Sequence, residues 1–259
     1  WVFLIFAILG VAGVACFQFL IGDIDVTEKY SWSAGPYLWY LRALPSCTPY
    51  MNAYLFNFLQ ALLIVFFVVE LEKRSRLTTM EPLWTRPSTN GELMWGRALG
   101  IGGMIILLNI ISVLVTMMLH LLIRPWAFDA SMYLFYFLTL TIPSLVFFLG
   151  VSMFVSYWIR SQGIAVLMLL ALIVIMIGSE GWLHGLMDPL AKTIPAVFSP
   201  EVGLVNMNLF LLQRLVFLSS GAALLVYSVF CAERLTGEAE KKNVLFLIGK
   251  MGLGIAIFA

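Results

Sequence analysis

Long apolar stretches alternate with short polar connections along almost the whole chain. A helix needs about 20 apolar residues to cross roughly 30 Å of hydrocarbon. Six stretches approach or exceed this length, at residues 1–22, 53–70, 98–123, 132–158, 163–178 and 208–232. A seventh stretch begins near Val244 but contains Lys250, which is typical of an interfacial segment that leads into a span. The pattern predicts an all-α integral membrane protein, a bundle of six transmembrane helices with the start of a seventh.

The composition supports this class and excludes others. The chain is 62% hydrophobic and only 11% charged, whereas a soluble domain of this length needs more charged surface. Its 15 basic and 14 acidic residues give no basic patch for nucleic acid, so we expect contact with membrane lipid and none with nucleic acid. Cys16, Cys47 and Cys231 are far apart and pair with no histidine, and we therefore expect no metal ion.

Basic residues gather in alternate connections, which predicts the orientation of the chain. The second, fourth and sixth connections contain Lys73, Arg74, Arg76, Arg86, Arg97, Arg160, Arg234, Lys241 and Lys242. Because basic loops stay in the cytoplasm, the first span should start there and the sixth should end there. We expect the bacterial inner membrane as the location.

The opposite, outer side is predicted to carry boundary residues and a re-entrant loop. Residues 179–207 are too apolar for solvent and too rich in Gly and Pro to span the membrane. Glu180, His184 and Asp188 would share one helical face and could bind a cation or form an outer gate, or they could form a solvated polar face. Arg214, near the outer end of the sixth span, should reach the interface. Aromatic residues expected at the outer boundary are Trp32, Tyr37, Trp39, Tyr40, Tyr50 and Trp126.

Polar side chains recur inside the predicted spans, where burial in lipid requires hydrogen-bonding partners. Asn57 and Gln60 share one helical face, and Asn109, Ser112 and Thr116 share another. These residues could line a translocation path, or they could form hydrogen bonds that hold the helices together.

Glycine and proline predict two local features of the spans. Gly100, Gly102 and Gly103 indicate close helix packing within the third span. Pro143 predicts a kink in the fourth span.

The connection at residues 71–97 is unusually polar and irregular. Thr78 and Thr89 each precede a glutamate by three residues, a pattern that caps the start of a helix. Pro87 should end the first helix before the second begins. We therefore expect a helical elbow whose second arm runs into the third span. From these features alone it could be an interfacial hairpin held by Trp and Arg, or a docking surface for a partner.

The order of residues in this segment resembles that between the second and third spans of ABC-2 type ABC transporter permeases. The matching residues are Thr79, Glu81, Leu83, Pro87, Thr89, Glu92, Gly96 and Arg97. The family usually has Lys where Arg97 stands and a helix former where Pro82 stands. The resemblance implies an ABC-2 type transmembrane domain at residues 1–232, followed by a cytoplasmic connection and the start of a further membrane segment at 233–259.

The resemblance also implies that residues 71–97 form a coupling segment seated on a cytoplasmic ATPase subunit. The residues expected to couple to this ATPase are Thr79, Glu81, Leu83, Trp84, Arg86, Pro87, Glu92 and Arg97. This chain has no G-x-x-x-x-G-K-[ST] phosphate loop, so ATP and Mg²⁺ should bind the partner, and no cofactor or enzymatic activity is expected in the chain itself. A second permease subunit would complete a homodimer or heterodimer.

The resulting hypothesis is the permease subunit of an exporter. The alternative is a membrane anchor or scaffold within a larger polypeptide, for example one fused to a peptidase domain. The apolar runs at Trp1 and Ala259 suggest that the chain extends further.

Overall fold

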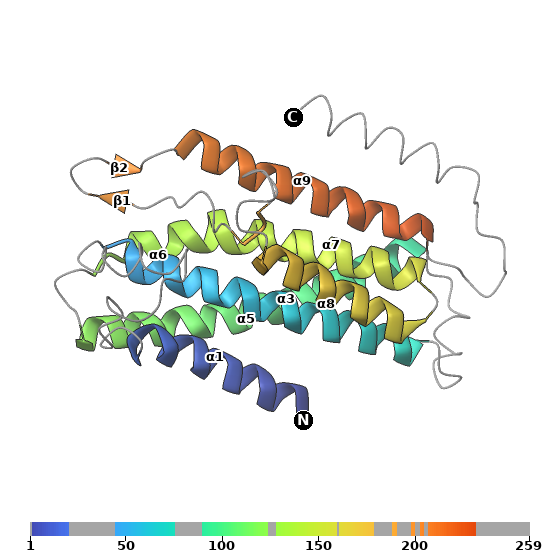
Figure 1. Ribbon diagram of the computed structural model, residues 1–259, viewed down its shortest axis with the longest axis horizontal. Coiled ribbons are helices and arrows are strands. Elements are labelled where there is room, and N and C mark those ends of the chain that lie inside the picture. Colours follow the sequence, from blue (N-terminus) through green and yellow to red (C-terminus); the bar gives the residue numbers. More distant parts are fainter. Residues whose placement is uncertain are drawn as a thin grey trace.

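The computed structural model describes residues 2–20, 45–75, 90–123, 128–159, 161–178, 188–190, 198–199, 203–204 and 207–231. Almost all of these residues are helical (Figure 1). The helices are α1 (Val2–Leu20), α3 (Cys47–Ser75), α5 (Asn90–Ile123), α6 (Ala130–Tyr136), the π-helical turn η4 (Phe137–Thr141), α7 (Ile142–Trp158), α8 (Gln162–Gly178) and α9 (Met207–Cys231). Two short strands, β1 (Phe198–Ser199) and β2 (Gly203–Leu204), pair antiparallel.

Four of the described helical segments are long and apolar enough to cross a membrane. They are Cys47–Arg74, Gly91–Ile123, Ala130–Trp158 and Met207–Val229. Shorter apolar segments lie in α1, at Ile5–Cys16, and in α8, at Gln162–Met176. The structure thus confirms a helical fold and indicates a multi-pass membrane protein, while the count of six spans stays a prediction.

The second and third predicted spans begin earlier than their apolar runs suggested. α5 starts at Asn90, directly after Thr89, and continues without a break into the apolar run. A helix therefore starts where the Thr89 and Glu92 pattern predicts one, while the elbow itself stays a prediction. α3 starts at Cys47, and Tyr50 is only 1% exposed, with its ring against that of Tyr136 at a centroid distance of 5.5 Å. Tyr50 therefore packs against Tyr136 of α6 instead of facing lipid headgroups, and its place at the outer boundary stays a prediction.

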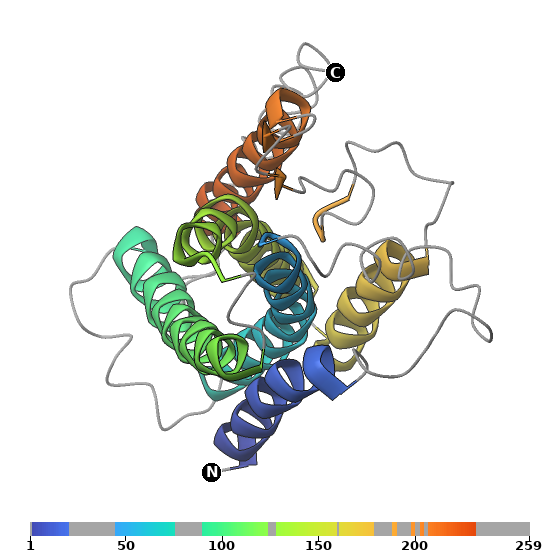
Figure 2. The ribbon, with the colours of Figure 1, turned by 90° about the vertical axis from the view of Figure 1, so that its left-hand side faces the viewer.

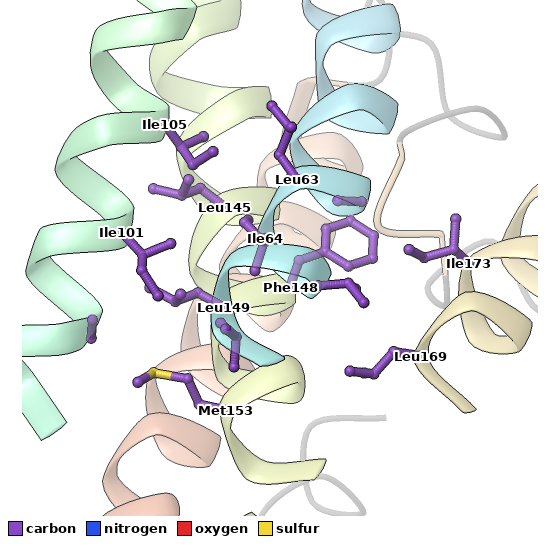
Figure 3. Close-up of a cluster of buried hydrophobic side chains, with 14 of the residues drawn as sticks. Leu63, Ile64, Ile101, Ile105, Leu145, Phe148, Leu149, Met153, Leu169 and Ile173 are labelled. Atoms are coloured by element: carbon purple, nitrogen blue, oxygen red, sulfur yellow. The ribbon is translucent and has the colours of Figure 1, made fainter. Parts of the chain in front are cut away.

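The helices pack around α3. It contacts α1, α5, α7 and α8, and α9 packs mainly on α7, as the end-on view in Figure 2 shows. Apolar side chains from four of these helices fill the centre (Figure 3). The labelled ones are Leu63 and Ile64 of α3, Ile101 and Ile105 of α5, Leu145, Phe148, Leu149 and Met153 of α7, and Leu169 and Ile173 of α8.

α7 and α9 cross closely at two isolated glycines. A Cβ atom on Gly150 of α7 would lie 2.3 Å from the carbonyl oxygen of Gly221 of α9, so any side chain would separate the backbones. The three glycines that were predicted to pack closely, Gly100, Gly102 and Gly103, have no such backbone neighbour in the described part of the chain. Apart from the adjoining backbone of α5 itself, no atom of the described residues lies within 4 Å of a Cβ built on Gly100 or Gly103. One on Gly102 would make only ordinary contacts, the nearest with Leu149 at 3.8 Å. The close packing predicted for Gly100 and Gly103 is therefore not found in the described fold.

The helix that contains Pro143 is irregular just before that residue. η4 is a π-helical turn in which the Ile142 N–H donates to the carbonyl of Phe137. Proline cannot donate a backbone hydrogen bond, and π-helical turns are among the usual causes of helix bending. The irregularity predicted from Pro143 thus takes the form of a π turn at Phe137–Thr141.

Candidate functional site

The five residues predicted to line a translocation path are all inside the bundle. Asn57, Gln60, Asn109, Ser112 and Thr116 are each at most 1% exposed. The apolar periodicity alone did not decide which face of each helix would be covered. The structure places all five on the buried faces of α3 and α5.

Ser112 and Thr116 belong to a polar cluster that links three helices. Gln18 Nε2 of α1 donates to Thr116 Oγ1 of α5 at 3.0 Å. Thr116 Oγ1 and Ser112 Oγ donate to Asn52 Oδ1 of α3 at 2.9 and 3.3 Å. The sequence placed Asn52 in the outer loop and so missed it. This cluster shows the interhelical hydrogen bonding that was one of the two interpretations of these residues.

Gln60 lies deeper in the bundle and joins α3 to the π turn. Its Nε2 donates to Asn57 Oδ1 at 2.7 Å and to the Thr141 carbonyl at 3.3 Å. Among the described residues, Asn57 Nδ2, Gln60 Oε1 and both side-chain polar atoms of Asn109 have no hydrogen-bond partner. Buried polar atoms are usually satisfied by protein or by ordered water. These atoms therefore suit water or a neutral hydrogen-bonding group, and the path interpretation stays open for them.

Arg214 of α9 is buried rather than directed to the membrane surface. It is 2% exposed, and its Nη1 and Nη2 donate to the carbonyls of Pro189 at 2.9 Å and Asp188 at 2.6 Å. Its Nη2 also donates to Gln213 Oε1 at 2.6 Å. The prediction that Arg214 reaches the interface is wrong, because the backbone at Asp188 and Pro189 returns into the bundle and replaces water as its hydrogen-bond acceptor.

The returning turn is itself fixed between helices. Ser144 Oγ of α7 donates to the Pro189 carbonyl at 2.6 Å, and Leu190, 2% exposed, joins the main apolar core. The carboxylate of Asp188 accepts the N–H of Leu190 at 3.1 Å. Asp188, Pro189 and Leu190 are thus held inside the bundle, and the re-entrant course of residues 179–207 stays a prediction. The other two predicted gate residues, Glu180 and His184, lie outside the described residues.

A charged group lies at the opposite end of the bundle, where α3 ends and α5 begins. Arg97 Nη1 of α5 is 3.2 Å from Glu72 Oε2 of α3 and also donates to the hydroxyl of Tyr157 of α7. The side chains of Arg97 and Glu72 are only 13% and 10% exposed. We call Glu72, Arg97 and Tyr157 the inner triad. It connects three helices through one guanidinium group.

The inner triad borders a small cavity, and Arg97 also lines a larger groove. The cavity, about 10 Å³, also touches Met153 and Ile101 and is near the lower limit for one water molecule. The groove, about 520 Å³, runs between α3 and α5 and is mainly apolar. Its lining residues are Phe67, Leu71, Glu92, Leu93, Gly96, Arg97, Gly100, Ile101 and Met104.

Two of the predicted ATPase-coupling residues fall in the described part of the chain. Glu92 is exposed in the first turn of α5, whereas Arg97 is turned toward Glu72. The remaining ones, Thr79, Glu81, Leu83, Trp84, Arg86 and Pro87, lie outside the described residues. The coupling role of all eight stays a prediction.

No protein-family model, curated protein or solved structure matches this chain. Among the described residues, no three His, Cys, Asp or Glu side chains come together in a way that could hold a metal ion. What the described residues do offer is neutral hydrogen bonding in the bundle interior, an arginine clamp on a re-entrant turn, and an ion pair between helices.

Proposed function

We propose that the chain is the permease subunit of an ABC transporter, an exporter that is driven by a separate ATPase subunit. In this proposal six spans cross the bacterial inner membrane, and both the start of the first and the end of the sixth are cytoplasmic. A second permease subunit completes the transporter. ATP and Mg²⁺ bind the ATPase subunits.

One observation carries the proposal beyond the resemblance in residues 71–97. Residues 76–89 of the coupling segment connect α3, which ends at Ser75, to α5, which begins at Asn90, and both helices are of membrane length. A movement of this segment would therefore act directly on two helices of the bundle.

The mechanism that follows is alternating access. Closure of the ATPase subunits on ATP moves the coupling segment, and α3 and α5 shift relative to α7. Asn57, Gln60 and Asn109 then provide neutral hydrogen-bonding groups along the route, and the turn held by Arg214 closes its outer end. These polar groups suit an amphipathic permeant better than a highly charged one, since the described interior of the bundle is otherwise mainly apolar.

The test is purification of the tagged chain from its native membrane in mild detergent. We expect an ATP-hydrolysing subunit to co-purify, and replacement of Glu81 or Arg86 by Ala to lower the recovered ATPase activity while leaving the amount of permease unchanged. Lys192→Ala, on the predicted outer side, is the matched control and should retain full activity. Recovery of the chain without any ATPase would contradict the proposal and favour the membrane-anchor alternative.

A further inference from the structure

The inner triad spans the base of the proposed coupling segment. Glu72 lies near the end of α3, and Arg97 lies early in α5. Residues 76–89 connect the two helices, and the Glu72–Arg97 ion pair joins the same two helix ends directly. A displacement of either helix end must stretch, break or carry along this pair.

The carboxylate of Glu72 lies near the C-terminus of α3, where the helix dipole disfavours a negative charge. Carboxylates are disfavoured at helix C-termini, because the unpaired carbonyls there give that end a partial negative charge. An acidic residue at this position therefore gains from a cation on another helix. Arg97 supplies that cation from α5 at 3.2 Å, in surroundings where both side chains are nearly excluded from solvent.

Tyr157 extends the connection to a third helix. The same Nη1 atom of Arg97 that faces Glu72 donates to the Tyr157 hydroxyl. Tyr157 lies near the end of α7, and α7 is in backbone contact with α9 at Gly150 and Gly221. The triad thus joins the two helices flanking the segment to the pair formed by α7 and α9.

A second ion pair at this end of the bundle lies within a single helix. Arg74 Nε is 3.0 Å from Glu70 Oε1, but both residues are on α3, and their side chains are 63% and 33% exposed. This pair links no two helices and is open to solvent. It provides a control for effects of charge at this end of the bundle.

We propose that the inner triad transmits movement of the coupling segment to α7, and that Arg97 is a positioning residue for transport instead of a contact to the ATPase. This inference rests on the proposed function. It assigns a role to Glu72 and Tyr157, which were not among the residues predicted from the sequence to be functional. It also redirects Arg97 from the partner's surface to the interior of the bundle.

The test uses the complex purified with its own ATPase subunit and reconstituted in lipid nanodiscs. Cys16, Cys47 and Cys231 are replaced by Ala, and spin labels are placed at Leu99 of α5 and Val226 of α9, which are 70% and 46% exposed. The distance between the labels is measured without nucleotide and with ATP plus vanadate, together with kcat and KM for ATP. The variants are Arg97→Gln, Tyr157→Phe, the exchange Glu72→Arg with Arg97→Glu, and the control Arg74→Gln.

We expect the parent complex and Arg74→Gln to show an ATP-dependent change in the distance distribution. Arg97→Gln and Tyr157→Phe should reduce the shifted population at least fivefold while KM for ATP stays within twofold, because ATP binding is in the other subunit. The charge exchange should restore at least half of the response. Thermal unfolding of each variant separates this effect from loss of the fold, and Tyr157→Phe, which removes one hydroxyl, decides the matter if Arg97→Gln does not fold.

Two results would overturn the inference. One is a normal distance change in folded Arg97→Gln or Tyr157→Phe. The other is loss of ATPase binding in Arg97→Gln with an unaffected Tyr157→Phe, since this would make Arg97 a docking contact. If the parent chain binds no ATPase at all, the proposed function itself fails, and this outcome is distinct from both.

Discussion

A methyl group at the crossing of α7 and α9 should be enough to destabilise the bundle. In Gly150→Ala the new Cβ would lie 2.3 Å from the Gly221 carbonyl oxygen, whereas ordinary contacts of this kind begin at about 3.4 Å. The obstacle is backbone, so no side-chain rotation can relieve it, and the two helices must separate by about 1 Å. Gly221→Ala meets the same difficulty, at 2.6 Å from the backbone N and Cα of Phe147.

The expected magnitude follows from two opposing terms. Overpacking of a well-packed interior costs about 1–3 kcal/mol, while Ala gains up to about 1 kcal/mol over Gly in helix propensity. The free energy of unfolding should therefore fall by about 1–2 kcal/mol in Gly150→Ala. Since about 1 kcal/mol corresponds to about 2–4 °C for a chain of roughly this size, the Tm should fall by at least about 2 °C.

The assay is thermal unfolding in detergent, followed with a thiol-reactive fluorescent dye. Cys16, which is exposed, and Cys231 are replaced by Ala, so that the dye reports on Cys47, which is 5% exposed and should react only when the bundle opens. Gly103→Ala is the matched control, because no atom of the described residues would contact its new methyl group within 4 Å. The two glycines share one contact, so the double variant should lose less than the sum of the single losses. If Gly150→Ala and Gly103→Ala melt at the same temperature, α7 and α9 do not cross as closely as the structure shows.

Two further outcomes follow from the buried polar groups. Arg214→Gln should lower the free energy of unfolding by about 2–4 kcal/mol, because the carbonyls of Asp188 and Pro189 lose a buried charged donor. Limited proteolysis should then cut the variant near Asp188 sooner than the parent protein. Unchanged cleavage would contradict the role of Arg214 in holding this turn. Asn52→Ala should lower the free energy of unfolding by about 1–2 kcal/mol, since it removes the acceptor shared by Thr116 and Ser112, and each interhelical hydrogen bond in a membrane contributes about 0.6 kcal/mol on average. An unchanged Tm would show that this polar cluster contributes little to stability.

The membrane-length helices could be predicted because lipid requires long apolar stretches. The burial of the five residues predicted to line a path is compatible both with a translocation path and with hydrogen bonds that hold the helices together. The burial of Tyr50 and of Arg214, which the sequence did not predict, has a common physical cause. Tyr50 and Arg214 resemble boundary residues by type and position, yet each is buried because a segment distant in sequence supplies its partner. No periodicity within one helix reports such a partner.

The glycine contact and the inner triad differ in how far the sequence could have revealed them. Gly150 and Gly221 stand alone in their helices, whereas the clustered glycines of α5 attracted the prediction of close packing. Glu72, by contrast, left a detectable signal. An acidic residue near the C-terminal end of a helix opposes the helix dipole, and this indicates a cation from elsewhere in the fold.

The clamp formed by Arg214 has a consequence for how the chain enters the membrane. An arginine at the centre of a span costs about 2.5–3.5 kcal/mol to insert, and one nearer the end of the span, such as Arg214, costs less but still needs a partner when it is buried. The carbonyls that it binds, at Asp188 and Pro189, precede it in the sequence and are therefore synthesised first. Hydrogen bonds to this earlier segment can therefore offset the free-energy cost of inserting Arg214 with α9. The chain can thus assemble at this end of the bundle in the order in which it is translated.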